Sequence, residues 1–290
     1  MEPSFLQIIL LGIIQGAAEL LPVSSSAHVI VAEKLMHMDP SSTEMTFLLV
    51  MLHTGTMFAV VAYFWNSWKR SFFSSSKAMA DAAFRVGLAT MITAFIYLFL
   101  NAIVKKTLLS DKPGAEVESL FSNLPLIAVS LAVAGLVIVI AGLRRTPVIV
   151  DPADGPLPPG KAMLIGMVQG ITLPFRGLSR SGTTISAGML VGVPKRVAEE
   201  FSFALAVIVT PPAIARELLR LYKSRSVDHA TVHLGPLLAP GLLGMVFSFG
   251  SGLLALRWLS GWLENGKWHY FGFYCFAAAA GVALLAHMGY

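Results

Sequence analysis

Two short segments carry polar groups capable of chemistry inside otherwise apolar runs. The first places a carboxylate and a histidine around three consecutive serines, in the set Gln15, Glu19, Ser24, Ser25, Ser26 and His28. The second places arginines and hydroxyls among glycines, in the set Arg176, Gly177, Ser179, Arg180, Ser181, Gly182 and Thr184. A carboxylate beside a hydroxyl can activate a nucleophile, and an arginine can bind phosphate oxygens through its planar fork. These residue types predict an anion-binding site.

The two segments read as imperfect copies of one another, 154 residues apart. Without a gap, the matched pairs are Gly12 with Gly166, Gln15 with Gln169, Gly16 with Gly170, and Ser25 with Ser179. In membrane proteins, paired apolar segments interrupted by glycine or proline point to the binding site. Because one copy brings the carboxylate and the other brings the arginines, we expect one site shared between the copies.

The composition indicates an integral membrane protein. Of the 290 residues, 56% are hydrophobic and only 13% are charged, and the mean hydropathy is +0.73. This is too little polar surface for a soluble domain of this length. The net charge of +5 suits loops that face anionic lipid headgroups, and its spread along the chain argues against nucleic acid as a partner. The single Cys275 excludes a disulfide framework and a cysteine-based metal site.

Charge-free runs predict the elements that position these residues. Six of them, most long enough to cross an apolar core of roughly 30 Å, are 45–68, 86–104, 119–143, 201–215, 229–256 and 268–290. The run 201–215 is short for a crossing unless flanking residues join it. Four others are too short to cross and predict re-entrant helices, namely 5–18, 20–32, 162–175 and 181–194. We therefore expect an all-α membrane protein with six transmembrane helices and two re-entrant helix pairs.

Each half of the chain contains one re-entrant pair followed by three crossings. An odd number of crossings turns the second half upside down relative to the first, which gives an inverted-topology repeat with the re-entrant tips near mid-membrane. The predicted parts are a first repeat over 1–145, a linker over 146–160 and a second repeat over 161–290.

The positive-inside rule gives only a small preference for one orientation. The larger set of basic residues, expected on the cytoplasmic side, is Lys69, Arg70, Lys77, Arg85, Arg144, Arg145, Lys161, Lys195, Arg196, Arg257 and Lys267. The opposite side keeps Lys105, Lys106, Lys112, Arg220, Lys223 and Arg225.

Glu19 is the only formal charge between Glu2 and Glu33. A carboxylate at membrane depth costs roughly 2.5–3.5 kcal/mol, so it needs a partner or a function. Gln15 lies four residues earlier, on the same helix face. A plainer interpretation is that Glu19 ends its helix and is solvated by a vestibule. The serines after it could cap the next helix, or together they could form an anion cradle with His28 at that helix N-terminus.

Arg180 also has a plainer interpretation, in which it pairs with Glu19 and does nothing else. Even this pairing brings the two copies together, because a buried arginine and a buried carboxylate each need the other. His53, His269 and His287 are most simply packed or lipid-facing. Glu199 and Glu200 could mark the start of a helix, where acidic residues are favoured.

The motifs resemble those of the undecaprenyl-diphosphate phosphatase family of the bacitracin-resistance type. The matching stretches, in the family's order, are Gln15 to Glu19, Pro22 to His28, Gly55 to Val60, Gly177 to Thr184, and Glu200 to Val207. A Glu/Gln-x-x-x-Glu motif is matched by Gln15 and Glu19, and a Pro-Gly-x-Ser-Arg-Ser-x-x-Thr motif is matched from Gly177. Two positions depart from the usual pattern: Gln15 is the option without a carboxylate, and Arg176 stands where proline is usual.

The resemblance implies a hydrolase of the bacterial cell (inner) membrane with several crossings and a site that opens to the extracytoplasmic side. It implies that undecaprenyl diphosphate is dephosphorylated to undecaprenyl phosphate, which recycles the lipid carrier for peptidoglycan synthesis and confers bacitracin resistance. The polyprenyl tail would lie along the apolar helices, among membrane lipids.

Site roles follow from the same resemblance. We expect Arg180, with Ser179, Ser181 and Thr184, to clamp the diphosphate. Ser25 is the expected nucleophile, with a bound water as the alternative, and His28 would protonate the departing phosphate oxygen or stabilise a phospho-intermediate. Glu19 would accept the proton or hold a divalent cation, Mg²⁺ or Ca²⁺. The remaining expected substrate-binding residues are Gln15, Ser24, Ser26, Gly177 and Gly182.

The competing class is a lipid carrier that flips polyprenyl phosphate and uses the polar cluster only for binding. A carrier of anions needs cations and hydrogen-bond donors, whereas Glu19 beside Ser25 puts negative charge next to a phosphate. This asymmetry favours catalysis, although a protein with both activities is not excluded by the residues. The prenyl chain length accepted and a homodimer are left open.

Overall fold

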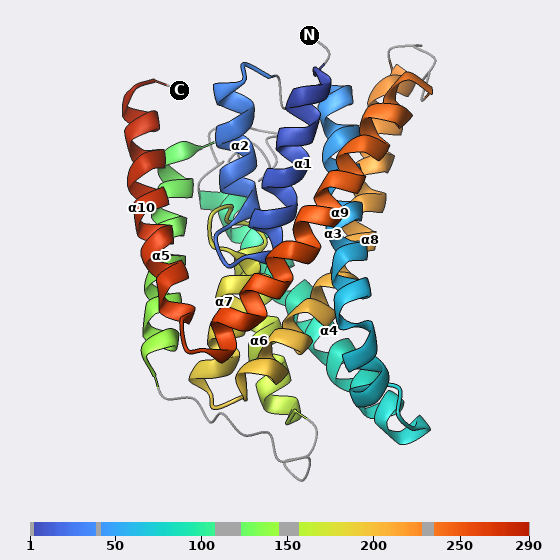
Figure 1. The fold of residues 1–290 in the computed structure, drawn as a ribbon, viewed down its shortest axis with the longest axis vertical. Helices are drawn as coiled ribbons and strands as arrows, with labels where there is room; N and C mark the ends of the chain where they lie inside the picture. The colour runs from blue at the N-terminus through green and yellow to red at the C-terminus, as the bar shows by residue number, and fades with distance from the viewer. Residues whose placement is uncertain (1–2, 39–41, 108–122, 145–156, 228–234, 290) are drawn as a thin grey trace.

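The computed structural model describes residues 3–38, 42–107, 123–144, 157–227 and 235–289. These residues are helical apart from short turns, and they contain no strand. The helices are α1 Phe5–Leu20, α2 Ser25–Leu35, α3 Thr43–Ser71, α4 Ser76–Thr107, α5 Leu124–Leu143, α6 Pro159–Thr172, α7 Arg180–Leu190, α8 Lys195–Val227, α9 Gly235–Glu264 and α10 Trp268–His287. Figure 1 shows them as a bundle of long helices around the shorter ones.

Six helices among the described residues are long and apolar enough to cross a membrane, as predicted. They are α3, α4, α5, α8, α9 and α10. The crossing expected at 201–215 is longer than its charge-free run, because α8 takes in the charged residues at its start and its span covers Lys195–Leu219. Charged side chains at a helix end can reach the interface while their stems cover apolar surface, so helices continue past the charge-free windows.

The four short helices form two pairs that occupy opposite halves of the bundle. Figure 1 places α1 and α2 in the half where the chain ends lie, and α6 and α7 in the other half. The second short helix starts at Ser25 rather than residue 20, because Leu21–Ser24 form the turn after α1. The relation of 1–145 to 161–290 as inverted repeats stays a prediction, and most of the 146–160 linker lies outside the described residues.

Glycines let each motif-bearing helix pack closely against a crossing helix. A Cβ added at Gly16 of α1 would lie 1.9 Å from Ser251 Oγ and 2.3 Å from the Ser248 carbonyl oxygen, both on α9. A Cβ at Gly166 of α6 would lie 2.4 Å from the Ala89 carbonyl oxygen on α4. Small residues allow such backbone contact between membrane helices. These contacts hold α1 and α6, and so both re-entrant turns, in place.

Two buried carboxylates fasten α8 to its neighbours. Glu199 accepts a hydrogen bond from Ser260 Oγ of α9 at 2.6 Å. Glu200 accepts one from Ser67 Oγ of α3 and pairs with Arg196 Nε at 3.1 Å. Both lie in the second turn of α8 and are buried. The sequence indicated only that these two residues could mark a helix start. The structure shows that they also link α8 to α9 and α3.

Replacing Gly16 by alanine is expected to lower the free energy of unfolding by about 1–3 kcal/mol, because the added Cβ forces α1 away from α9. Gly87→Ala is the matched control, since no atom lies within 4 Å of its added Cβ. That variant should be neutral or more stable by up to about 1 kcal/mol, because alanine favours helix. Thermal unfolding in detergent measures both, and equal midpoints for the two variants would contradict this packing.

Candidate active site

The turns of both short-helix pairs end in a serine with left-handed backbone geometry. Ser24 has φ 68° and precedes α2, and Ser179 has φ 47° and precedes α7. Such a conformation costs a non-glycine residue of order 1–3 kcal/mol and tends to occur at functional sites. Each of these serines directly precedes the second helix of its pair, so Ser24 corresponds to Ser179 in the fold. The gap-free sequence alignment instead matched Ser25 with Ser179, which differs by one residue. The shift arises because the turn between α6 and α7 is longer than the turn between α1 and α2.

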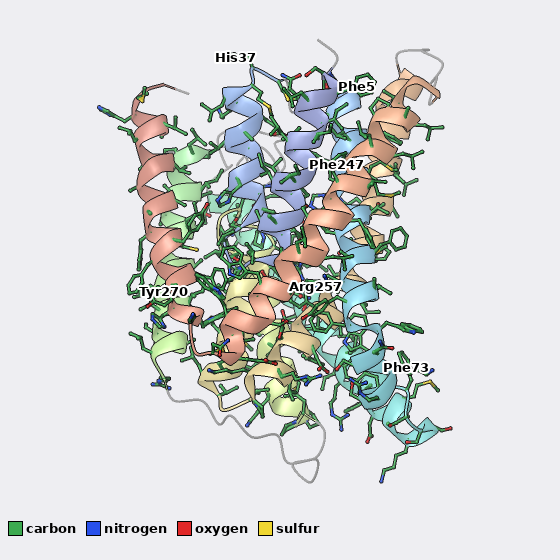
Figure 2. All side chains as sticks on the ribbon, viewed as in Figure 1. Phe5, His37, Phe73, Phe247, Arg257 and Tyr270 are labelled. Carbon is green, nitrogen blue, oxygen red and sulfur yellow. The ribbon has the colours of Figure 1, made fainter. Side chains whose placement is uncertain are left out.

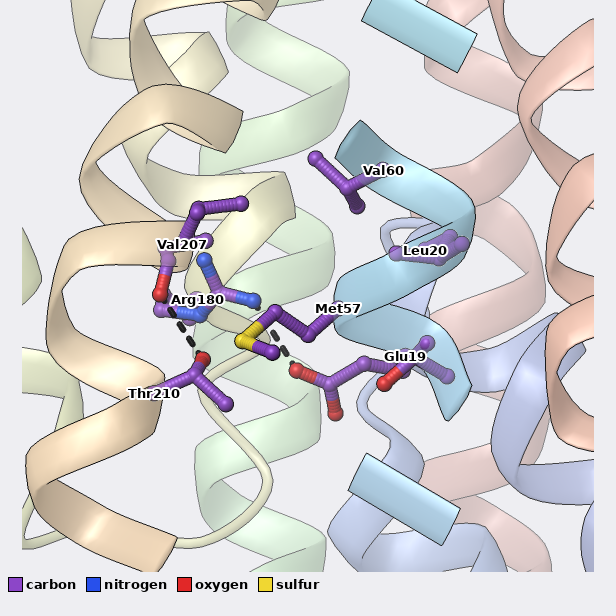
Figure 3. Close-up of a pocket in the computed structure, with 9 residues that line it drawn as sticks. Glu19, Leu20, Met57, Val60, Arg180, Val207 and Thr210 are labelled. Carbon is purple, nitrogen blue, oxygen red and sulfur yellow. Dashed lines mark hydrogen bonds and ion pairs between the residues drawn. The ribbon is translucent and has the colours of Figure 1, made fainter. Parts of the chain in front are cut away.

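Glu19 is the centre of a cluster that joins the two segments. Arg180 Nη2 donates to Glu19 Oε1 at 2.9 Å, and the two side chains are 18% and 19% exposed (Figure 3). Ser25 Oγ donates to Glu19 Oε2, and Gln15 Nε2 lies 3.4 Å from the same oxygen. The structure thus brings together four predicted site residues, two from α1 and one from the start of each of α2 and α7. Gln15, itself buried, orients Glu19.

A pocket opens beside this cluster, between α3 and α8. Its lining residues are Glu19, Leu20, Thr56, Met57, Val60, Arg180, Ala206, Val207 and Thr210 (Figure 3). The empty volume among these residues is about 220 Å³, which includes space open to the surroundings. Arg180 Nη1 is buried and has no hydrogen-bond partner in the described part of the chain. Because buried donors are almost always paired, this one is available to an anionic ligand.

The hydroxyls around Arg180 are engaged by the protein itself. Ser179 Oγ accepts from the Gly182 amide at 3.3 Å, and Ser181 Oγ donates to the Leu21 carbonyl oxygen at 3.3 Å. Thr184 Oγ1 bonds Ser202 Oγ of α8 at 2.6 Å. None of these three predicted phosphate ligands lines the pocket. Their contacts instead fix the start of α7, and with it the position of Arg180.

The start of α2 differs from that of α7 because it has no side-chain cap. Ser24 Oγ lies 3.2 Å from Ser26 Oγ. The Ser24 side chain makes no hydrogen bond to an amide of the first turn of α2, whereas a capping serine would. The first-turn amides of α2 therefore keep their capacity to bind an anion at the positive end of the helix dipole.

Two predicted glycines serve close backbone approach. Gly177 has φ 104°, and a Cβ there would lie 2.6 Å from the Ile127 carbonyl oxygen of α5. A Cβ at Gly182 would lie 3.0 Å from Pro22 Cβ, in the turn of the other segment. A side chain at either position would separate the elements that form the site.

His28 turns toward α10 rather than toward the pocket. Its Nδ1 lies 2.8 Å from the Ser24 carbonyl oxygen, so Nδ1 carries the hydrogen, and its Nε2 lies 2.7 Å from the hydroxyl of Tyr274. The two rings are stacked, with centroids 5.6 Å apart. No sequence pattern marks Tyr274, which is one of two tyrosines in α10. The structure thus places His28 next to Ser24 and Ser25 along α2 but outside the pocket lining.

The pocket walls on α3 and α8 were not predicted as part of the site. Two sequence features mark them in retrospect: the stretch beginning at Gly55–Thr56, and the prolines Pro211 and Pro212 that follow Thr210 within α8. Proline has no amide hydrogen, so the helix loses two internal hydrogen bonds next to the pocket.

Arg176, the departure from the family pattern, has an electrostatic partner in Glu33 of α2. Glu33 is only 1% exposed. The two side chains, one from each half of the chain, therefore lie close enough to interact electrostatically.

The residues at the site fit a metal ion only in part. Within the described ranges, no group of three or more His, Cys, Asp or Glu side chains could hold one. Glu19 is the single carboxylate in the pocket lining, and both of its oxygens accept hydrogen bonds from protein groups. One carboxylate suits Mg²⁺ or Ca²⁺ when substrate phosphates and water complete the coordination.

Comparison with known proteins identifies the family. A relative from Acinetobacter baylyi named Undecaprenyl-diphosphatase 2 is 52% identical over 284 residues, which cover 97% of this chain and 98% of that protein. A protein named Undecaprenyl-diphosphatase from Anaeromyxobacter sp. is 32% identical, over 99% of this chain and 89% of its own length. Another of that name, from Desulfatibacillum aliphaticivorans, is 30% identical, over 96% of this chain and 97% of its own length. The family model for bacitracin resistance protein BacA matches residues 8–281. This chain therefore belongs to the BacA family of bacitracin resistance proteins.

Proposed function

We propose that this membrane enzyme hydrolyses undecaprenyl diphosphate to undecaprenyl phosphate and inorganic phosphate. Its relatives carry the name of that activity. The observation that carries the proposal is the buried, unpaired Nη1 of Arg180 beside Glu19. An arginine with one unpaired nitrogen, in a pocket with otherwise mostly apolar walls, is suited to a phosphate on an apolar tail.

The residues divide the work of phosphoryl transfer. Arg180 and the open amides of α2 bind the phosphate oxygens and stabilise the charge that develops on them. Glu19 accepts the proton of the attacking oxygen, which belongs to Ser25 or to a water held in the same place. The new bond forms to the terminal phosphorus, and the bond from that phosphorus to the bridging oxygen breaks. Undecaprenyl phosphate leaves, and if Ser25 attacks, water then hydrolyses the phosphoserine.

A divalent cation is part of the proposal. Glu19 would hold it together with the substrate phosphates. When bound, the cation neutralises phosphate charge and so reduces the repulsion between the diphosphate and the Glu19 carboxylate.

The apolar tail would leave the site between α3 and α8. Met57 and Val60 on α3 face Val207 on α8 across the pocket. Next to them in sequence, Phe58 and Ile208 are 49% and 48% exposed, as expected for side chains in contact with lipid. A polyprenyl chain can therefore pass from the pocket into the bilayer over apolar surface.

We place the enzyme in the bacterial cell (inner) membrane, with its site open to the extracytoplasmic side. Basic residues mark the ends of α3, α6, α8 and α10 that lie in the half of the bundle with α6 and α7 (Figure 1); they are Lys69, Arg70, Lys161, Lys195 and Lys267. Figure 2 labels Phe73 and Tyr270, which follow the end of α3 and the start of α10 in that half. The positive-inside rule assigns that half to the cytoplasm, so α1 and α2 enter from outside. The undecaprenyl phosphate returned there supports peptidoglycan synthesis. A homodimer stays a prediction.

The alternative of a lipid carrier gains no support from the named relatives, which are diphosphatases. A carrier also has no evident use for a serine hydroxyl bonded to the carboxylate beside the phosphate site.

Arg180→Ala and Glu19→Ala should each lower kcat/KM for a C55 or C15 prenyl diphosphate by about 100-fold or more, because each removes charge that acts on the reacting phosphate. Phosphate release from purified protein in detergent measures this. Arg257→Ala, at an exposed position on α9, is the matched control and should keep wild-type activity. No release from folded wild-type protein across several divalent ions would refute the proposed hydrolysis.

Chelation of divalent ions should abolish phosphate release, and added Mg²⁺ or Ca²⁺ should restore it. Glu19→Gln should fail to recover at any cation concentration, since the uncharged amide is a weaker ligand than the carboxylate and cannot accept the proton of the attacking oxygen. The measurement is a cation titration of chelated wild type and variant. Full activity in the presence of the chelator would rule out the cation.

Tyr274→Phe should lower kcat about 3- to 10-fold with little change in KM, because His28 Nε2 loses the hydrogen bond that orients the ring. The same substitution in a His28→Gln background should have no further effect, which a double-mutant cycle measures. Additive effects would mean that Tyr274 acts independently of His28.

A further inference from the structure

His53 lies on the pocket-lining face of α3. Residues 53, 56, 57 and 60 share one helix face by their spacing, and Thr56, Met57 and Val60 all line the pocket. α3 begins in the half of the bundle that holds α1 and α2 (Figure 1). His53 precedes Thr56 by one turn, so it lies closer to that half than Thr56 does. Its side chain is partly buried. His53 is therefore placed at the rim of the pocket, on the side from which substrate would enter.

One nitrogen of His53 is available to a ligand. Nδ1 lies 2.8 Å from the Leu49 carbonyl oxygen, which can only accept, so Nδ1 carries a hydrogen. Nε2 makes no hydrogen bond to any residue whose placement the structure describes. His28 differs in that both of its nitrogens have protein partners, Ser24 and Tyr274.

Charge connects His53 to the catalytic cluster. Glu19 interacts electrostatically with His53 as well as with Arg180. Apart from Glu19 and Arg180, which are paired with each other, the groups near this turn of α3 are uncharged. Ser248 of α9 donates to the Leu52 carbonyl oxygen, and the pocket residues on α8 are Ala206, Val207 and Thr210.

We propose that His53 is a further substrate-contacting residue, whose Nε2 forms a hydrogen bond with an oxygen of the diphosphate group. This inference rests on the proposed function and extends it. The free Nη1 of Arg180 offers N–H donors from one side only, whereas a diphosphate presents several oxygens. His53 supplies a further hydrogen-bonding group from α3, while Arg180 approaches from α7.

The test compares His53→Ala and His53→Gln with His287→Gln, an exposed histidine at the end of α10. Binding of a C15 prenyl methylenediphosphonate, whose bridging carbon prevents hydrolysis, gives Kd without turnover, and hydrolysis of the C15 diphosphate gives kcat and KM. We expect His53→Ala to raise Kd and KM about 10- to 100-fold, as for loss of a hydrogen bond to a charged group. His53→Gln, similar in size and uncharged, should raise both by a smaller factor, and His287→Gln should raise neither.

Wild-type Kd and KM in both His53 variants would overturn the proposal. A wild-type Kd in His53→Gln alone would show that an amide can replace the imidazole and would overturn the assignment of the contact to Nε2. Thermal unfolding in detergent identifies a variant that has lost its fold; His53→Gln then decides the question, because glutamine can keep the bond to Leu49. Failure of the proposed function has a different signature, namely no phosphate release by wild type, and the binding comparison remains valid in that case.

Discussion

The ion pair between Glu19 and Arg180 is the contact on which the arrangement of this protein depends. A carboxylate buried in an apolar segment of a membrane protein is costly unless a cation meets it, and the cation comes from a segment 161 residues away in the chain. Both turns must therefore reach the same point from opposite halves of the bundle. Gly182 permits that approach, Gly177 lets the second turn lie against α5, and Gly16 and Gly166 let the preceding helices lie against α9 and α4.

The two segments contribute differently once they meet. The hydroxyls of the second segment are bonded to the protein and hold Arg180 at the start of a capped helix. The first segment keeps its reactive groups open: Ser25 donates to Glu19, and the amides at the start of α2 have no side-chain cap. In the proposed mechanism, one copy of the motif positions the Arg180 guanidinium, and the other holds the nucleophile and its base. Divergence of this kind between copies is typical of a catalytic site, since a site used only for binding has no need of a base.

The sequence predicted the six crossings, the short helices and the meeting of Glu19, Ser25 and Arg180, because each follows from a local rule: charge-free length, helix spacing, or the need of a buried charge for a partner. Contacts that depend on how distant helices pack could not be predicted. The bond from His28 to Tyr274 joins residues 246 positions apart, and no pattern in α10 distinguishes that tyrosine. The match of Arg176 with Glu33 required knowing that the second turn lies beside α2. The phosphate-binding roles expected of Ser179, Ser181 and Thr184 stay predictions; what the motif did not show is that these hydroxyls bond to the protein around Arg180.

The pairing that assembles the site also sets a condition on substrate binding. Arg180 already neutralises Glu19, so a diphosphate that shares this arginine brings more negative charge than one guanidinium can offset. Binding must therefore recruit further positive groups close to Glu19. Under the proposed function, the open amides of α2 would supply partial charge at a helix end and a divalent cation would supply two full charges. If these groups take up the phosphate charge, Arg180 can turn from Glu19 to the phosphate, and Glu19 loses the counter-ion that holds it ionised. In that order, with neutralisation of the phosphate first and proton transfer second, the carboxylate that stabilises the empty site would also serve as the base.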